Sequence, residues 1–164
     1  MIKFLFKLGF AFSSNPIKNG YIYNSSANKF LFFPEETNDA ETKDGYFSDF
    51  PVSLFNVDKA PNSSYYTVKL NGTRSGEVFD LDRQRKRILG WVYKSSENSN
   101  QLVEFKVENT RTADLKIIIE GLCLTAGIVQ PYFDACQDLD SQKWNIYDEK
   151  DLKNELSELN EGQI

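Results

Sequence analysis

A short unit recurs three times along this chain, and this repetition limits the possible folds more than any other feature of the sequence. Each copy runs for roughly 40 to 50 residues, opens with a mostly apolar triplet and closes with a second triplet that leads into a strand. The opening triplets are Phe30-Leu31-Phe32, Val78-Phe79-Asp80 and Cys123-Leu124-Thr125, and the closing triplets are Ser53-Leu54-Phe55, Gln101-Leu102-Val103 and Gln142-Lys143-Trp144. Repeats of this length indicate a propeller, a solenoid or a barrel with pseudo-threefold symmetry.

The composition favours strands over helices in each unit. Aromatic residues make up 14% of the chain, with thirteen Phe and eight Tyr against a single Met, and rings of this kind are enriched in strands. A propeller needs about four to eight blades, which three short units cannot supply. The sequence therefore predicts an all-β protein, a β-trefoil with a closed six-stranded barrel and a hairpin cap.

Apolar runs bounded by turn residues locate the individual strands. The predicted strands cover residues 21–23, 30–33, 51–58, 66–70, 77–81, 88–93, 103–107, 115–119 and 122–125, and a further strand follows the last closing triplet and ends near Asp148. Residues 34–49 are acidic and rich in turn formers, so we expect a surface loop there. Asn71-Gly72 predicts a tight hairpin.

The chain divides into a trefoil domain, residues 20–148, and two flanking segments. Residues 1–19 form an N-terminal extension or a signal segment, because residues 1–12 are apolar with Lys3 and Lys7 near the start. Residues 149–164 are an acidic amphipathic tail, with Leu152, Leu156 and Leu159 spaced for one face of a short helix. A frayed tail is the alternative. No stretch approaches the roughly 20 apolar residues that span a bilayer.

Charge and the absence of histidine narrow the range of functions. The net charge is −5 and the pI is about 4.9, which argues against nucleic acid because phosphate binding needs clustered cations. The chain contains no His, so the Ser-His and Cys-His nucleophile arrangements and the commonest zinc ligand are excluded. We therefore predict a protein that is not an enzyme and that uses no cofactor or metal.

The only two cysteines, Cys123 and Cys136, lie in the same repeat. Either they are reduced and buried, or they form a disulfide that stabilises the fold by about 2 to 4 kcal/mol. A disulfide would imply an oxidising compartment, and hence a secreted or cell-surface protein. Reduced cysteines together with an uncleaved N-terminus would imply a cytoplasmic one.

The second repeat holds the residues with the clearest binding chemistry. The carboxylate of Asp80 can accept two hydroxyl groups in charge-assisted hydrogen bonds, and the Trp91 indole offers a flat apolar face. Asn100 can donate and accept, whereas Lys94 can only donate. Together these four residues can surround one small polar ligand. The alternative is that Asp80 is a solvated turn residue and Trp91 belongs to the core.

Several of these residues make the chain similar to the ricin B-type lectin family. Cys136 precedes Gln142-Lys143-Trp144 by five intervening residues, as in the Gln-x-Trp repeat of that family, and Cys123-Leu124 matches the family's opening pair. In repeat two, Trp91, Lys94, Asn100 and Gln101 match a sugar-binding repeat without a gap, and Val78-Phe79-Asp80 resembles its opening.

This resemblance implies a β-trefoil, a disulfide between Cys123 and Cys136, and sugar binding by Asp80, Trp91, Lys94 and Asn100. Gln101, Gln142 and Trp144 would hold the backbone of their own repeats together. The chain departs from the family at several positions. Phe32 and Thr125 stand where repeats one and three would need an acidic ligand, Val103 replaces the closing Trp of repeat two, and Leu89 replaces a further polar ligand.

A basic loop beside Asp80 suggests a second kind of function. Arg83, Arg85, Lys86 and Arg87 could contact an anion or a partner, or could form a solvated hairpin tip. The leading hypothesis is a non-catalytic lectin whose partner is a glycan or glycoprotein. The other is a trefoil without sugar binding that joins a protein or ribonucleoprotein complex through this loop and its termini.

Overall fold

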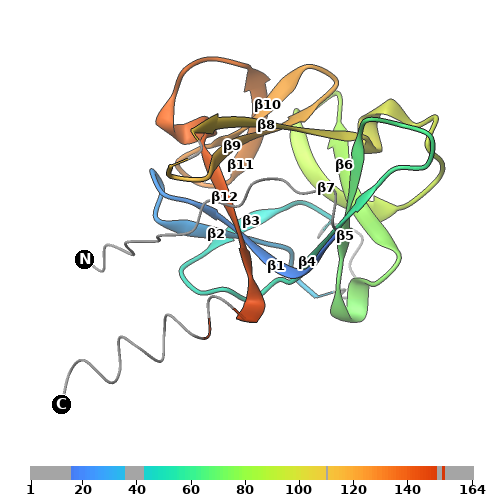
Figure 1. Cartoon of the computed structure of the whole chain (residues 1–164), viewed down its shortest axis with the longest axis horizontal. Helices are drawn as coiled ribbons and strands as arrows, with labels where there is room; N and C mark the ends of the chain where they lie inside the picture. Colours follow the sequence, from blue (N-terminus) through green and yellow to red (C-terminus); the bar gives the residue numbers. More distant parts are fainter. Residues whose placement is uncertain (1–15, 36–42, 110, 151–152, 154–164) are drawn as a thin grey trace.

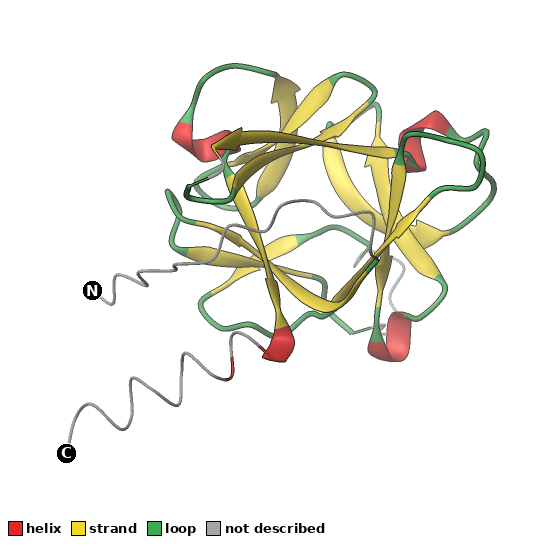
Figure 2. Ribbon diagram, viewed as in Figure 1, coloured by secondary structure: helices red, strands yellow, loops and turns green. Residues whose placement is uncertain are grey.

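The computed structural model describes residues 16–35, 43–109, 111–150 and 153. In sequence order these residues form β1 (Ile17–Asn24), β2 (Lys29–Phe32), β3 (Tyr46–Ser48), β4 (Phe55–Lys59), β5 (Tyr66–Leu70), η1 (Gly72–Arg74), β6 (Glu77–Asp82), β7 (Arg87–Val92), η2 (Ser99–Gln101), β8 (Val103–Asn109), β9 (Asp114–Ile119), β10 (Leu122–Ala126), β11 (Pro131–Ala135), η3 (Asp140–Gln142) and β12 (Trp144–Asp148). Figure 1 labels the strands, and Figure 2 shows that strands and loops make up almost all of the molecule.

Six strands close into a barrel. Strand β1 pairs with β12 and β4, β4 pairs with β5, β5 with β8, β8 with β9, and β9 with β12, all antiparallel. The ring has no free edge, which removes the unpaired backbone groups that an open sheet would expose. This barrel confirms the prediction of a closed six-stranded trefoil.

Three hairpins, β2–β3, β6–β7 and β10–β11, complete the three repeats. Each repeat contributes a barrel strand, a hairpin and a second barrel strand, in the order β1 to β4, β5 to β8 and β9 to β12. In Figure 1 the repeats follow one another along the colour scale, the first in blue to cyan and the last ending in red. The chain is therefore a β-trefoil.

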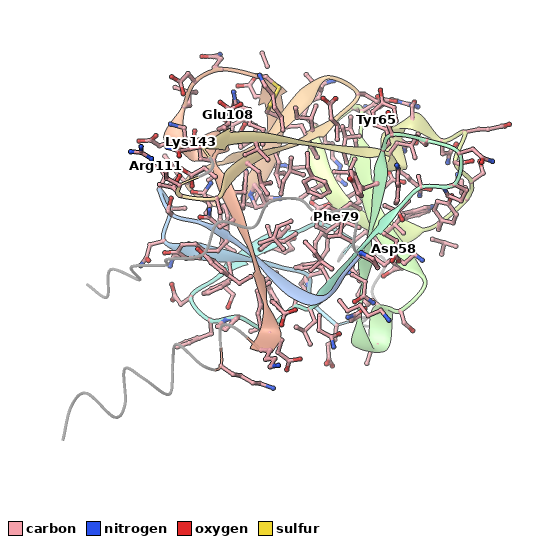
Figure 3. All side chains as sticks on the ribbon, viewed as in Figure 1. Asp58, Tyr65, Phe79, Glu108, Arg111 and Lys143 are labelled. Carbon is pink, nitrogen blue, oxygen red and sulfur yellow. A yellow bond between two sulfur atoms is a disulfide. The ribbon has the colours of Figure 1, made fainter. Side chains whose placement is uncertain are left out.

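Equivalent positions of the repeats meet in one core. The middle residues of the opening triplets, Leu31, Phe79 and Leu124, are at most 1% exposed. The last residues of the closing triplets, Phe55, Val103 and Trp144, are fully buried as well. Figure 3 places Phe79 near the middle of the molecule, where its ring centroid lies 5.3 Å from that of Phe55. Aromatic rings at this separation attract each other edge to face.

Three local predictions need correction. Residues 34–49 were expected to be loop throughout, but β3 occupies Tyr46–Ser48 within them. Strand β11, Pro131–Ala135, was not predicted at all. The Asn71-Gly72 pair does not form a two-residue hairpin, because Gly72 begins the 3-10 helix η1 and β5 pairs with β6 only at Lys69 and Val78.

The flanking segments fall largely outside the described residues. Strand β1 begins at Ile17, three residues before the predicted domain boundary at residue 20. The predicted C-terminal helix lies mostly outside the described residues. Of this segment the structure describes Glu149, Lys150 and Lys153, and Lys153 Nζ lies 2.7 Å from Glu149 Oε1. Within the described part of the chain, no helix is long and apolar enough to cross a membrane.

Candidate functional site

The β6–β7 hairpin presents the candidate residues on its outer face. Val78 lies opposite Trp91, and Asp80 lies opposite Leu89. Directly opposed residues of an antiparallel pair point to the same face, and so do residues two apart on one strand. Asp80, Leu89 and Trp91 therefore share the outer face, whereas Phe79 and Ile88 point into the core and are fully buried.

The carboxylate of Asp80 is held by two side-chain amides from η2. Asn100 Nδ2 donates to Asp80 Oδ1 at 2.7 Å, and Gln101 Nε2 donates to Asp80 Oδ2 at 2.8 Å. Asp80 is only 6% exposed, and this burial raises the pKa of its carboxyl group above the ordinary 3.8, although the two amides act in the opposite direction. Each carboxylate oxygen keeps a further lone pair as an acceptor.

Gln101 and Gln142 make the same bonds in their two repeats. The Gln101 amide donates to Val92 O at 3.0 Å and accepts from Lys94 N at 3.0 Å. The Gln142 amide donates to Ala135 O at 2.9 Å and accepts from Gln137 N at 2.8 Å. Both side chains are fully buried. Each glutamine thus ties the end of a hairpin to the closing triplet of its own repeat.

Trp144 and Trp91 lie in opposite environments. Trp144 is fully buried, and its indole Nε1 donates to Leu124 O at 2.8 Å. Trp91 is 42% exposed, so it is not a core residue. Lys43 Nζ lies over the Trp91 ring, 5.6 Å from its centroid. The Trp91 indole is therefore a surface ring beside Asp80.

Asn100 and Lys94 complete the group predicted from the sequence. Asn100 is half-buried against Asp80, and Lys94 is exposed. The charge of Lys94 lies close enough to Asp80 to lower the pKa of that carboxyl group, although burial outweighs it. The structure thus brings Asp80, Asn100 and Lys94 together, with Trp91 on the same face of the hairpin.

The first and third repeats have no carboxylate at the equivalent position. In repeat three, Thr125 is 3% exposed, and its hydroxyl donates to Cys123 O at 3.0 Å and accepts from Gln142 Nε2 at 3.1 Å. In repeat one the position is Phe32, and Ser53 Oγ replaces the glutamine by accepting from Phe33 N at 3.0 Å. Among the residues that the structure describes, the polar arrangement around Asp80 occurs in repeat two alone.

The basic loop is largely neutralised by carboxylates of other segments. Arg83 pairs with Glu120, and the Ser99 hydroxyl also donates to Glu120, at 2.6 Å. The Arg83 guanidinium lowers the pKa of Glu120 from 4.5 to about 2, with help from Ser99. Arg85 donates two hydrogen bonds to Asp44, at 2.9 and 3.0 Å. These pairs reduce the net positive charge that the loop presents.

The other two basic residues have backbone roles in the cap. Lys86 has a positive φ of 56° at the hairpin tip, and its carbonyl oxygen accepts from Phe133 N at 2.7 Å. Arg87 lies opposite Tyr132 where β7 meets β11. The loop therefore joins repeat two to repeat three.

The two cysteines form the disulfide that the family resemblance implied. Cys123 and Cys136 are joined with an S–S distance of 2.00 Å, and the bond ties β10 to the end of β11. The sulfur atoms are drawn in yellow in Figure 3. Among the described residues, no group of His, Cys, Asp or Glu could hold a metal ion.

Some residues around the site were not foreseen. Lys43, Asp44, Ser99 and Glu120 contact the hairpin or its loop. Lys43 and Asp44 come from repeat one, and Glu120 from the turn between β9 and β10. No local pattern in the sequence signals these contacts, because each depends on how separate repeats pack.

Comparison with known proteins finds similarity in structure only. No protein-family model matches the chain, and no curated protein sequence matches it. A salivary protein from Culex, of the Cysteine and Tryptophan-Rich family, aligns over 84% of this chain and 99% of its own, with 16% identity and a TM-score of 0.66. SeviL, solved with the asialo-GM1 saccharide, aligns over 81% of this chain and 98% of its own, with 12% identity and a TM-score of 0.61.

A third similar structure is a module of a larger enzyme. The GlcNAcα1-4Gal-releasing endo-β-galactosidase from Clostridium perfringens aligns over 79% of this chain but only 32% of its own length, with 13% identity and a TM-score of 0.63. At these identities the similarity defines the fold and not the ligand. The chain is a β-trefoil, and repeat two carries its candidate site.

Proposed function

We propose that this protein is a non-catalytic, lectin-like module that binds glycans through Asp80, Trp91, Lys94 and Asn100. The observation that carries the proposal is the Asp80 carboxylate, which two amides hold in place beside an exposed indole. Held in this way, the carboxylate can accept two hydroxyl groups of a sugar without rearranging. The Trp91 face can then contact the C–H side of the same ring.

The polar groups favour a ligand that donates hydrogen bonds to Asp80. The oxygens of an ionised Asp80 are acceptors only, so they bind hydroxyl groups and repel an anionic substituent placed against them. Asn100 and Lys94 stand at the rim and can donate to ring or hydroxyl oxygens. We therefore expect the sugar unit in contact with Asp80 to be neutral.

Such a module would work outside the reducing cytosol. The Cys123–Cys136 disulfide is of a kind that forms and persists in oxidising compartments. We therefore extend the proposal to a secreted or cell-surface protein whose partner is a glycan or glycoprotein. A sugar bound by one shallow site is held weakly, so function would depend on several copies or on dense ligand.

A glycan array tests the proposal directly. Neutral and acidic glycans are printed at low and high density, and the native chain is applied to them. The Asp80→Ala and Trp91→Ala variants are applied in parallel after thermal melts confirm that they fold. Thr125→Ala is the matched control, because it alters the equivalent position of repeat three. We expect both site variants to lose binding and the control to keep it.

A negative result would favour a different function. If the native protein binds no glycan at high density, the lectin proposal is wrong, and the trefoil would be a module that contacts protein or ribonucleoprotein. Arg83, Arg85, Lys86 and Arg87 would then be the first residues to replace in a search for that partner.

A further inference from the structure

A segment of repeat one, residues 43–45, lies along the outer edge of strand β7; we call it the strap. Gly45 N donates to Ile88 O at 2.8 Å, and Gly90 N donates to Lys43 O at 2.9 Å. Asp44 is thereby placed opposite Leu89. The strap thus adds a short third strand to the β6–β7 hairpin, whose outer face holds Asp80 and Trp91.

Lys43 of the strap is fixed against the aromatic ring of the candidate site. Its Nζ lies 5.6 Å from the centroid of Trp91 and 2.9 Å from Glu77 Oε1. Glu77 is itself 6% exposed and pairs with the buried Arg74. A cation at this distance from an indole is attracted to the ring, so Lys43 restricts the orientation of Trp91.

Asp44 of the strap shares the face of the candidate site. It lies opposite Leu89, which lies opposite Asp80, so the three side chains form a row across three strands. Neighbouring strands are about 4.8 Å apart, which separates Asp80 from Asp44 by roughly 10 Å with Leu89 between them. Leu89 is apolar, and the strap places the Asp44 carboxylate, bonded to Arg85, beside it.

Arg85 holds Asp44 in this position. Its Nη atoms donate to both Asp44 oxygens, and its Nε donates to Asp82 Oδ2 at 2.6 Å. A guanidinium has five N–H donors, and these three bonds leave two for a ligand. Arg85 is about half exposed, whereas Asp44 is buried, so Asp44 fixes Arg85, and the guanidinium can face solvent and a bound glycan.

We propose that the strap forms the third wall of the repeat-two glycan site, with Lys43 as a positioning residue for Trp91 and the Asp44–Arg85 pair as a specificity-determining group. This inference rests on the proposed function. The site is then built from two repeats, and Arg85, held by Asp44, contacts a second sugar unit or a substituent beyond the unit held by Asp80. Only glycans extended toward Leu89 use the strap.

Fluorescence tests the positioning role without a glycan. The chain has two Trp residues, and Trp144 is fully buried while Trp91 is 42% exposed, so a collisional quencher reports Trp91. Lys43 attracts the iodide anion to that ring, and neutral acrylamide is insensitive to charge. In Lys43→Met we expect the ratio of iodide to acrylamide quenching to fall, and Lys43→Arg should restore it. Lys69→Met, which removes a lysine paired with Asp58 on β4, is the control.

Calorimetry with galactose and with the asialo-GM1 saccharide tests the specificity role. We expect Lys43→Met to weaken binding of both probes about two- to fivefold, because Trp91 must then be ordered on binding at a cost comparable to one exposed cation–π contact. Asp44→Asn and Arg85→Gln should weaken binding of the longer asialo-GM1 saccharide and leave the affinity for galactose unchanged. A general loss of stability would not separate the two probes in this way.

The outcomes separate this inference from the proposed function. If native protein binds and Asp80→Ala abolishes binding, but Lys43→Met and Asp44→Asn match the native protein in quenching and affinity, the strap proposal alone is overturned. If native protein binds neither probe and no glycan on the array, the proposed function fails, and the strap loses its role with it.

Discussion

Gln101 and Gln142 show why a β-sheet core of this kind keeps buried amides. Each amide accepts a hydrogen bond from one backbone N–H and donates one to a backbone carbonyl of its own repeat. These backbone groups lie at the ends of strands, where no neighbouring strand pairs with them. A buried backbone group without a partner is costly, so the glutamine satisfies groups that the barrel geometry leaves open.

Replacing Gln142 by Ala should therefore destabilise the fold. The substitution leaves the Ala135 carbonyl and the Gln137 N–H without their partner, and we expect a loss of about 2–3 kcal/mol in the free energy of unfolding. Urea unfolding followed by fluorescence measures it. Gln137→Ala is the matched control, because that side chain is exposed and only its backbone takes part. Equal stability of the two variants would contradict this role for the amide.

The candidate site was predicted from the sequence where its residues belong to one repeat. Asp80, Trp91, Asn100 and Gln101 follow one another at spacings that a single hairpin and its closing turn can bring together, and the structure places them on one face or in direct contact. Lys43 could not be predicted in this way. It reaches Trp91 only because a loop of repeat one crosses to the edge of β7, and such packing leaves no local pattern.

Charge pairs as well as backbone hydrogen bonds join the tip of the β6–β7 hairpin to the rest of the trefoil. Arg83 and Ser99 bind Glu120, which lies in the turn between β9 and β10 with a positive φ of 51°. Because the folded state holds the pKa of Glu120 at about 2, against 4.5 ordinarily, the ionised group stabilises the fold. That contribution is complete above the unfolded pKa and is lost as the pH falls through the folded one.

Accordingly, the free energy of unfolding of the Glu120→Gln variant should depend less on pH in the acidic range than that of the native protein. We expect the native protein to lose stability between about pH 5 and pH 2 to a greater degree than the variant, by no more than about 1 kcal/mol because Arg83 is largely exposed and screened. Urea unfolding at a series of pH values measures the difference. If the free energy of unfolding changes with pH equally in the two proteins, the ionisation of Glu120 does not contribute to stability.

The β10–β11 hairpin depends on its disulfide. The bond between Cys123 and Cys136 closes a loop at a separation of 13 residues, and a loop of about this length gives roughly 3 kcal/mol in the chain-entropy model. We expect the paired Cys123→Ser and Cys136→Ser variant to lose about 2–4 kcal/mol. The native protein under reducing conditions should show the same loss, and a smaller change in both would contradict the estimate.

Strands were predicted well where apolar runs bounded by turn residues mark them, and β3 and β11, which lack such a signal, were missed. Strand β3 has three residues, Tyr46–Ser48, in an acidic stretch whose composition is that of a loop. It forms because it pairs with β2, placing Phe47 opposite Leu31. Strand β11 likewise takes its conformation from pairing with β10. Tertiary pairing outweighed local preference in both cases.

The trefoil itself could be predicted because the same sequence pattern occurs in all three repeats. Each repeat contributes equivalent core residues, such as Leu31, Phe79 and Leu124. Once one repeat is recognised in the sequence, the other two can be located by aligning them with it. Binding chemistry does not follow this symmetry. Phe32 and Thr125 keep the fold at the positions equivalent to Asp80, but neither can supply the two acceptor oxygens of a carboxylate.

One site on a threefold scaffold predicts a specific kind of binding. If only repeat two holds a glycan, titration calorimetry should give one ligand per chain, and Asp80→Ala should remove it. Binding to a glycan surface should then rise steeply when copies are linked, because the second contact is made at the high effective concentration that linkage creates.

A tandem fusion of two chains joined by a flexible Gly/Ser linker measures this gain. On a dense glycan surface we expect the fusion to bind at least about 100-fold more tightly than the single chain, and on a sparse surface to bind like the single chain. The matched control is the same fusion with Asp80→Ala in one copy. A stoichiometry above one, or strong binding by that control on the dense surface, would show that repeat one or three also binds glycan and that Phe32 and Thr125 do not exclude it.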